Sequence, residues 1–379
     1  MKKSIFTLLL LALIAGFGNL NLQAQEAGYE KADNPLFTPW AEEVTPENAL
    51  PEYPRPQMKR DHWKNLNGLW DFQITSKPGG PREYEDQILV PYPVESALSG
   101  VKQTVGAKNR VWYKRSFTLD NPYENGRVLL HFGAVDWESD VFVNGEYVGK
   151  HQGGYDPFTY DITEYIESDG PQSIEVTAWD PTDKGYQPVG KQTHDPRSIW
   201  YTAVTGIWQT VWLEYVPQSY IKDLKITPQL DKSRVKVEVS AKNVSYDHQI
   251  RLVAKDEGQT VGTSTGFHDN RLFVKLDDPK LWSPENPFLY DLEVQLLDKN
   301  DNAVDQVESY FGMRKISLGK GEDGYTRLFL NNEPLFQLGP LDQGWWPDGL
   351  YTAPTDEALK YDVKVTKDLG FNMLRKHVK

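Results

Sequence analysis

Short runs in which hydrophobic and polar residues alternate dominate the chain after its first sixty positions, and this alternation is typical of half-buried β-strands. Over residues 61–217 these runs are rich in aromatic and β-branched residues, with turn residues between them. In SDVFVNGEYVG, alternating valines precede Asn144 and Gly145, the pair that supplies the two positive φ angles of a tight hairpin turn. The pattern predicts a β-sandwich of the jelly-roll kind over residues 61–217.

A second β unit is predicted for residues 218–317. The segment VKVEVS alternates cleanly, as an antiparallel strand with one solvated face should. About six such runs follow one another in this stretch, which is typical of an immunoglobulin-like sandwich. No cysteine is present to form the disulfide found in many such domains.

The pattern changes after residue 317. TRLFLNNEPLF predicts a hairpin that turns at residues 331–332. Residues 356–369 have the one strong helical pattern of the chain, with Thr355 as the expected N-cap and Gly370 at the position that favours a positive φ angle. The segment FNML then predicts a strand from Phe371. Strand, helix and strand in this order predict the start of a β/α repeat.

The N-terminus has the order of a secretory signal. Two lysines precede an apolar run over residues 5–17, and a polar segment leads to Ala24, the expected cleavage position. The run is too short for a membrane span of about 20 apolar residues. We therefore expect a signal peptide over residues 1–24 and a periplasmic or secreted protein with no membrane span. The proline-rich residues 25–60 predict an extended leader.

Composition narrows the function classes. The 379 residues have a formal net charge of −13, which argues against nucleic acid as a partner, because phosphate recognition needs clustered Lys and Arg. The absence of cysteine excludes a disulfide framework, a thiolate metal site and a cysteine nucleophile. The seven histidines are scattered, so no structural metal and no cofactor is expected.

Several motifs together resemble glycoside hydrolase family 2. LNGLWDFQI, VPYPVES, WYKRSFTL and TGIWQTVWLE resemble the sugar-binding jelly roll of that family. LWSPENPFLYDLEVQL and YFGMRKI resemble the end of its immunoglobulin-like domain, and LFLNNEPLFQLG resembles the entry to its (β/α)8 catalytic barrel. The resemblance implies a mainly β chain that ends in an incomplete barrel over residues 318–379.

The resemblance also implies a reaction. Family members hydrolyse O-glycosidic bonds of β-linked sugars with retention, through an acid/base and a nucleophile that are both glutamates late in the barrel. No residue of this chain matches either glutamate, so we expect no catalytic residue here and no turnover by the isolated chain. The parent enzyme would resemble a β-galactosidase, β-glucuronidase or β-mannosidase acting on a β-linked oligosaccharide. A non-catalytic carbohydrate-binding protein and one half of a split enzyme, completed by a partner chain or in an oligomer, stay open as alternatives.

Four residues are expected on the substrate side. Arg375 matches the arginine of an Asn-x-x-Arg sequence at the end of an early barrel strand, with a structural ion pair as the alternative. Asp342 and Trp346 lie on the loop after the first barrel strand, where a packed loop covering the barrel core is the alternative. Asp180 matches an aspartate that lies near the active site in related enzymes and can help to bind a cation, although Asp-Pro also favours a local turn.

Overall fold

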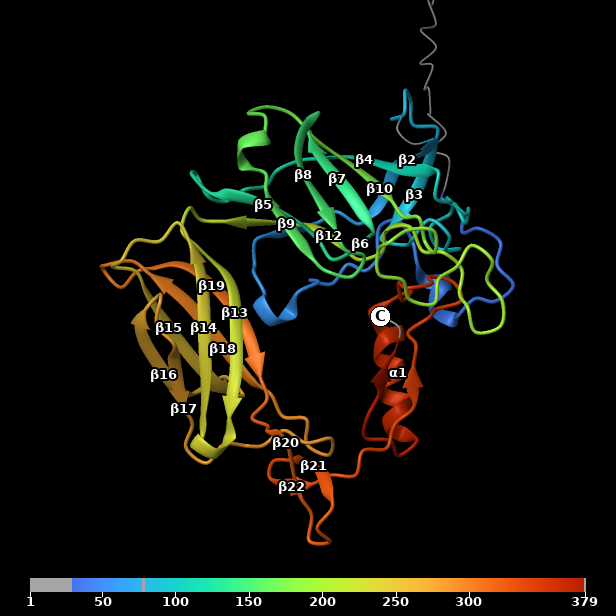
Figure 1. The fold of residues 1–379 in the computed structure, drawn as a ribbon. Coiled ribbons are helices and arrows are strands. Elements are labelled where there is room, and N and C mark those ends of the chain that lie inside the picture. The colour runs from blue at the N-terminus through green and yellow to red at the C-terminus, as the bar shows by residue number, and fades with distance from the viewer. Residues whose placement is uncertain (1–28, 77–78, 378–379) are drawn as a thin grey trace, which may run out of the picture.

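The computed structural model describes residues 29–76 and 79–377, and the predicted signal peptide lies outside the described residues. The fold is mainly β, as predicted, and α1 (Asp356–Asp368) is the one α-helix in the described part of the chain. In Figure 1 a first sandwich lies at the top, a second at the left, and α1 at the right. The hairpin strands β20–β22 lie at the bottom, between the second sandwich and α1.

The first sandwich is built from two antiparallel sheets and a short strand pair. One sheet has the order β1–β12–β5–β9, the other β3–β2–β4–β10–β7–β8, and β11 pairs with β6. Asn144 and Gly145 turn β7 into β8 with φ angles of 50° and 82°, which confirms the predicted hairpin. The bounds are β1 (Trp63–Asn65), β2 (Gly68–Ser76), β3 (Asp86–Val90), β4 (Asn109–Phe117), β5 (Arg127–Phe132), β6 (Val135–Asp136), β7 (Glu138–Val143), β8 (Glu146–Gln152), β9 (Phe158–Asp161), β10 (Gln172–Trp179), β11 (Gly206–Ile207) and β12 (Val211–Val216).

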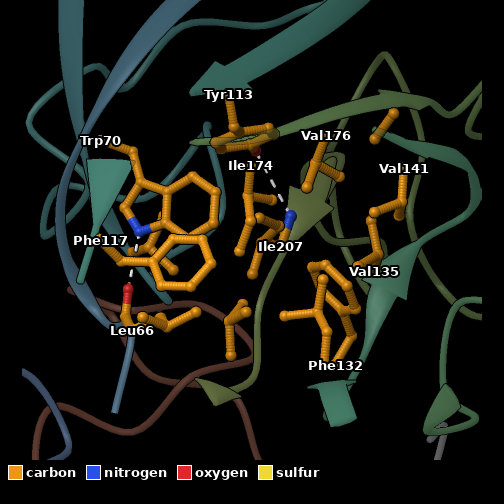
Figure 2. Close-up of a cluster of buried hydrophobic side chains, with 14 of the residues drawn as sticks. Leu66, Trp70, Tyr113, Phe117, Phe132, Val135, Val141, Ile174, Val176 and Ile207 are labelled. Carbon is orange, nitrogen blue, oxygen red and sulfur yellow. Dashed lines mark hydrogen bonds between the residues drawn. The ribbon is translucent and has the colours of Figure 1, made fainter. Parts of the chain in front are cut away.

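Large aromatic side chains lie in the middle of the core of this sandwich. Trp70 from β2 is almost fully buried, and its Nε1 donates a hydrogen bond to the backbone oxygen of Leu66 at 2.8 Å (Figure 2). The hydroxyl of Tyr113 accepts a hydrogen bond from the backbone nitrogen of Ile207 at 3.3 Å. A Cβ atom on Gly206, whose φ angle is +88°, would lie 2.0 Å from that hydroxyl, so this position requires glycine.

The second sandwich packs a three-stranded sheet, β13–β14–β17, against a four-stranded sheet, β16–β15–β18–β19. Strand β14, which contains the predicted VKVEVS, alternates buried valines with half-buried positions over residues 234–238, as a strand with one face in the core should. The bounds are β13 (Tyr220–Gln229), β14 (Arg234–Lys242), β15 (Gln249–Asp256), β16 (Gln259–Phe267), β17 (Leu272–Lys275), β18 (Tyr290–Leu297) and β19 (Ala303–Phe311).

A buried ion network joins the two sandwiches. The guanidinium of Arg60 makes two hydrogen bonds with the carboxylate of Asp305 from β19, at 2.6 and 3.0 Å. Its Nε lies 3.3 Å from a carboxylate oxygen of Glu214 in β12, and Nη2 donates to the backbone oxygen of Ile221 at 2.6 Å. Arg55 contacts the other side of Glu214 at 2.7 Å. The leader therefore supplies the cations that connect the two sandwiches.

The C-terminal segment begins with the sheet β20–β21–β22, whose bounds are β20 (Ile316–Lys320), β21 (Thr326–Leu330) and β22 (Glu333–Pro334). Residues 331–332 have φ angles of 53° and 70°, which confirms the predicted turn. The hydroxyl of Thr355 accepts a hydrogen bond from the backbone nitrogen of Ala358, and Gly370 has a φ angle of 87°, so both ends of α1 follow the prediction.

Strand β23 (Leu341–Asp342) and strand β24 (Arg375–Lys376) are parallel neighbours connected through α1. The second strand is shorter than predicted, because it begins at Arg375 and not at Phe371. Before Arg375 the side chain of Asn372 takes part in the pairing. It accepts a hydrogen bond from the backbone nitrogen of Leu338 at 2.9 Å and donates one to the backbone oxygen of Phe336 at 2.9 Å, beside the backbone bond from Asn372 to the oxygen of Leu338 at 3.1 Å.

Candidate functional site

The loop of residues 343–354, which follows β23, is docked on the first sandwich. The hydroxyl of Tyr351 lies 2.6 Å from the hydroxyl of Tyr155. The hydroxyl of Thr352 donates to the backbone oxygen of Trp208 at 2.5 Å, and Tyr92 donates to the backbone oxygen of Pro354 at 2.7 Å. These bonds fix the C-terminal end of β23 relative to the first sandwich.

The leader holds the same loop from the other side. The backbone nitrogen and the hydroxyl of Thr38 both donate to one carboxylate oxygen of Asp348, at 2.8 and 2.6 Å, and Asp348 is fully buried. The ring of Trp40 packs edge-to-face on Trp346, with 6.3 Å between the ring centroids. The 343–354 loop is therefore clamped between the leader and the first sandwich.

A long segment between β10 and β11 also reaches this loop. The side chains of Lys191 and Tyr201 both donate to the amide oxygen of Gln343, at 3.2 and 2.9 Å. The ring of Tyr201 stacks on Trp345 with 4.3 Å between centroids and 12° between planes. Tyr201, Gln343 and Trp345 line one side of an open hollow of about 570 Å³ at the end of β23. An open, aromatic and polar hollow of this size suits a small polar ligand.

Asp180 lies in a tight local turn at the start of this segment. Its carboxylate accepts hydrogen bonds from the backbone nitrogen and the hydroxyl of Thr182, at 2.9 and 3.1 Å, and the residue is only 5% exposed. The local turn that Asp-Pro favours is therefore present. Burial raises the pKa of Asp180 to about 6, although the hydrogen bonds from Thr182 oppose the shift.

Two further carboxyl groups, those of Asp136 and Glu95, lie near Asp180, and the sequence did not indicate that the three come together. Burial, with the charges of Asp180 and Glu95, raises the pKa of Asp136 well above its usual range. Burial raises the pKa of Glu95 to about 7. The Glu95 carboxylate accepts hydrogen bonds from the backbone nitrogen and hydroxyl of Thr205, at 2.8 and 2.7 Å. Asp136 and Asp180 also raise the pKa of Tyr351, after the larger effect of its burial, so the acids lie close to the docked loop.

The raised pKa values of these acids predict that the free energy of unfolding falls as the pH rises. Because the pKa of Glu95 is about 7 in the folded chain against 4.5 in the unfolded chain, the folded state holds the proton more tightly. The resulting stability is complete below pH 4.5 and is lost as the pH rises through 7, with a total on the order of 3 kcal/mol. Glu95→Gln keeps a partner for both groups of Thr205 and removes the charge.

We expect Glu95→Gln to raise the midpoint of thermal unfolding at about pH 8 and to leave it nearly unchanged at about pH 4. Glu146→Gln, at an exposed position in β8, is the matched control and should shift neither midpoint. Equal shifts for Glu95→Gln at both pH values would show that the carboxyl is not held protonated by its surroundings.

The structure places Arg375 and Asp342 on opposite faces of the β23–β24 pair. The register aligns Leu341 with Arg375 and Asp342 with Lys376, and side chains alternate between the faces of a strand. Asp342 makes an ion pair with Lys376 at 2.6 Å, and both charges affect the pKa of Asp362 on α1. Asp342 therefore lies on the helix side, while Arg375 is exposed on the other side. The two residues are not brought together.

Trp346 is buried, with 7% of its surface exposed, and packs against Trp40, Ala353 and Ala358. Its packing matches the alternative of a loop that covers a core, whereas Trp345 and Tyr201 form the stacked pair at the hollow. Within residues 29–76 and 79–377, no group of three or more His, Asp or Glu side chains is arranged to hold a metal ion. In the same residues, no helix has the length and hydropathy needed to cross a membrane.

Comparisons with known proteins match most of the two sandwiches. The family model described as "Glycosyl hydrolases family 2, sugar binding domain" matches residues 79–217. The model described as "Glycosyl hydrolases family 2" matches residues 219–314. The sequence is similar to a β-galactosidase from Thermoanaerobacter pseudethanolicus, with 29% identity over 281 residues that cover 70% of this chain and 36% of the relative.

Other relatives agree with this placement. A β-glucuronidase from Paenibacillus borealis is 24% identical over 313 residues, which cover 76% of this chain and 50% of the relative. The chain thus spans between about a third and a half of the length of these relatives. Among solved structures, a β-glucuronidase from Ruminococcus gnavus has the same fold, with a TM-score of 0.70 and 20% identity over 86% of this chain and 57% of that protein.

Proposed function

This chain belongs to glycosyl hydrolase family 2. From that premise we propose that it forms the N-terminal part of an exported glycosidase, including the sugar-binding domain, and that this glycosidase cleaves β-linked sugars with retention. The observation that carries the proposal is the match of two consecutive family models over residues 79–217 and 219–314. Relatives named β-galactosidase and β-glucuronidase suggest a β-galactoside or β-glucuronide as the substrate. The basic and apolar N-terminal run supports export.

The C-terminal segment is the proposed start of a (β/α)8 barrel, after a first sandwich of the jelly-roll kind. The parallel pair β23–β24 with α1 as its connection supports this, because parallel strands joined by a helix are the repeating unit of such barrels. In that arrangement the face opposite α1 is the barrel interior, so Arg375 would point inward, at the end of the barrel where substrates bind. Asp342, on the α1 side, would act on the substrate only through Lys376 and the 343–354 loop.

The isolated 379-residue chain is proposed to be inactive. A retaining glycosidase needs two carboxyl groups about 5–5.5 Å apart on either side of an accessible glycosidic bond. Glu95 and Asp180 do not meet this need, because each is less than 10% exposed and bonds to a threonine. Asp180 bonds to Thr182 in its own turn, and Glu95 bonds to Thr205 on the segment between β10 and β11. Their role is to shape the sandwich beneath the docked loop.

Retention is tested on the polypeptide encoded by the complete reading frame that contains these residues. Proton NMR of aryl β-galactoside and aryl β-glucuronide hydrolysis should show the β-anomer of the released sugar first, with the α-anomer arising later by mutarotation. Initial release of the α-anomer would overturn the proposed mechanism. Hydrolysis of α-glycosides only would overturn the proposed substrate class.

A further inference from the structure

A loop of residues 191–201 projects from the segment between β10 and β11, on the side of the molecule that holds the C-terminal segment (Figure 1). A parallel bridge between Gln192 and Tyr201 closes the loop. The backbone nitrogen of Thr193 donates to the oxygen of Tyr201 at 2.9 Å, and the nitrogen of Tyr201 donates to the oxygen of Lys191 at 2.9 Å. The 191–201 loop is therefore closed by backbone hydrogen bonds within a long connection.

The base of the 191–201 loop is fixed to the end of β23. Tyr201 stacks on Trp345, and Trp345 packs edge-to-face on Tyr351 with 5.5 Å between centroids. Lys191 and Tyr201 share the amide oxygen of Gln343, one residue after β23. Because two side chains at the base of the loop bond to one acceptor, its tip has a set position beside the hollow.

The tip carries large apolar side chains that the described chain leaves open. Residues 195–200 are all exposed, and Ile199 and Trp200 keep 60% and 47% of their surface in solvent. The backbone nitrogen of Trp200 donates to the oxygen of Arg197 at 3.1 Å, which closes a turn between the two residues. An aromatic ring that is exposed on a closed, anchored turn is available for contact with a ligand.

The chemistry of the tip fits a carbohydrate. An indole ring offers an apolar face for the C–H groups of a sugar ring, and it loses little conformational entropy on binding. Arg197 and Asp195 lie on the same turn as Trp200, with side chains that are 80% exposed and that pair with each other at 3.6 Å. They supply donors and acceptors for hydroxyl groups. A protein partner would call for a larger continuous apolar area than this one short turn provides.

We propose that Trp200, assisted by Arg197, binds an outer sugar unit of a β-linked oligosaccharide whose reacting end lies at the C-terminal end of β23. The inference rests on the proposed function, because it takes the end of β23 as the place of the reacting sugar. Tyr201 and Gln343 lie between the tip and that strand end, so Trp200 contacts a unit beyond the reacting one. The site would select oligosaccharides over monosaccharide glycosides.

Binding is measured by isothermal titration calorimetry and saturation-transfer NMR on the 379-residue chain. The probes are cellotetraose, mannotetraose and galactotetraose, with galactose and glucuronic acid as single sugars. At least one tetrasaccharide should bind, and Trp200→Ala should weaken that binding about tenfold. Tyr246→Ala is the matched control at an aromatic residue that is 89% exposed on the second sandwich, and it should leave binding unchanged.

Arg197→Ala should weaken tetrasaccharide binding less than Trp200→Ala does. Equal affinity of the wild type and Trp200→Ala, or no binding of any tetrasaccharide, would overturn the inference. A wild-type dimer in sedimentation velocity that Trp200→Ala converts to monomer would assign the tip to self-association and overturn it too. The readout does not depend on hydrolysis, so a wrong reaction mechanism would be seen separately in the anomer measurement.

Discussion

Replacing Arg60 with alanine is expected to lower the free energy of unfolding by about 3–5 kcal/mol, because the change leaves the buried carboxylate of Asp305 without its cation. The side chains of Asp305 and Glu214 are 2% and 1% exposed, and both lie within 3.3 Å of the guanidinium. Asp305 keeps only the backbone nitrogen of Ile221, at 2.7 Å, as a donor. The penalty is the desolvation of an unpaired carboxylate, which exceeds the net value of the ion pair itself.

Urea unfolding followed by tryptophan fluorescence measures this effect. Lys59→Ala is the matched control, because its side chain is half exposed and lies 4.0 Å from the exposed Glu308, so its loss should cost less than about 1 kcal/mol. Since Arg60 joins the two sandwiches, Arg60→Ala should also separate their unfolding into two transitions. A single transition with wild-type stability would contradict the assignment of Arg60 as the buried connection.

Trp70→Ala is expected to cost about 3–5 kcal/mol, because it removes the largest fully buried side chain of the first sandwich and leaves a cavity. The loss also removes the hydrogen bond to the backbone oxygen of Leu66, which lies between β1 and β2. An unpaired buried carbonyl adds to the cost of the cavity. The expected result is a marked fall in the urea midpoint of the first sandwich. The near-ultraviolet circular dichroism signal should begin to fall at a lower urea concentration than in the wild type.

The control for Trp70→Ala is Tyr147→Ala in β8, an aromatic residue of the same sheet that is half exposed. It should change the free energy of unfolding by less than about 1 kcal/mol. Trp70→Phe should fall between the two, since it restores most of the volume without the hydrogen bond. Similar losses for Trp70→Ala and Tyr147→Ala would show that the first sandwich has no core centred on Trp70.

Local signals in the sequence predicted local structure well. The turn at Asn144 and Gly145 and the cap at Thr355 depend on neighbours within a few residues, so the sequence alone is enough to predict them. The resemblance of several motifs to one family predicted the two sandwiches and their order, which the matches over residues 79–217 and 219–314 support.

The parts that the sequence did not predict depend on long-range contacts. Glu95 and Thr205 are 110 positions apart, and Arg60 and Asp305 are 245 apart, so no local pattern indicates either pair. Trp346 was expected on the substrate side, but Trp40 from the leader packs on it. The opposite faces of Asp342 and Arg375 follow from the register of two very short strands, which only the structure gives. The substrate roles of Arg375, Asp342, Trp346 and Asp180 stay predictions.

The central claim is that this chain supplies the N-terminal part of a family 2 glycosidase, and that this part does not contain the catalytic carboxylates. Aryl β-galactoside and aryl β-glucuronide hydrolysis by the purified 379-residue chain, compared with the polypeptide of the complete reading frame, tests it most directly. The account predicts no turnover by the first polypeptide and clear turnover by the second. Turnover by the 379-residue chain that persists through repeated purification, or no turnover by the complete polypeptide, would contradict it.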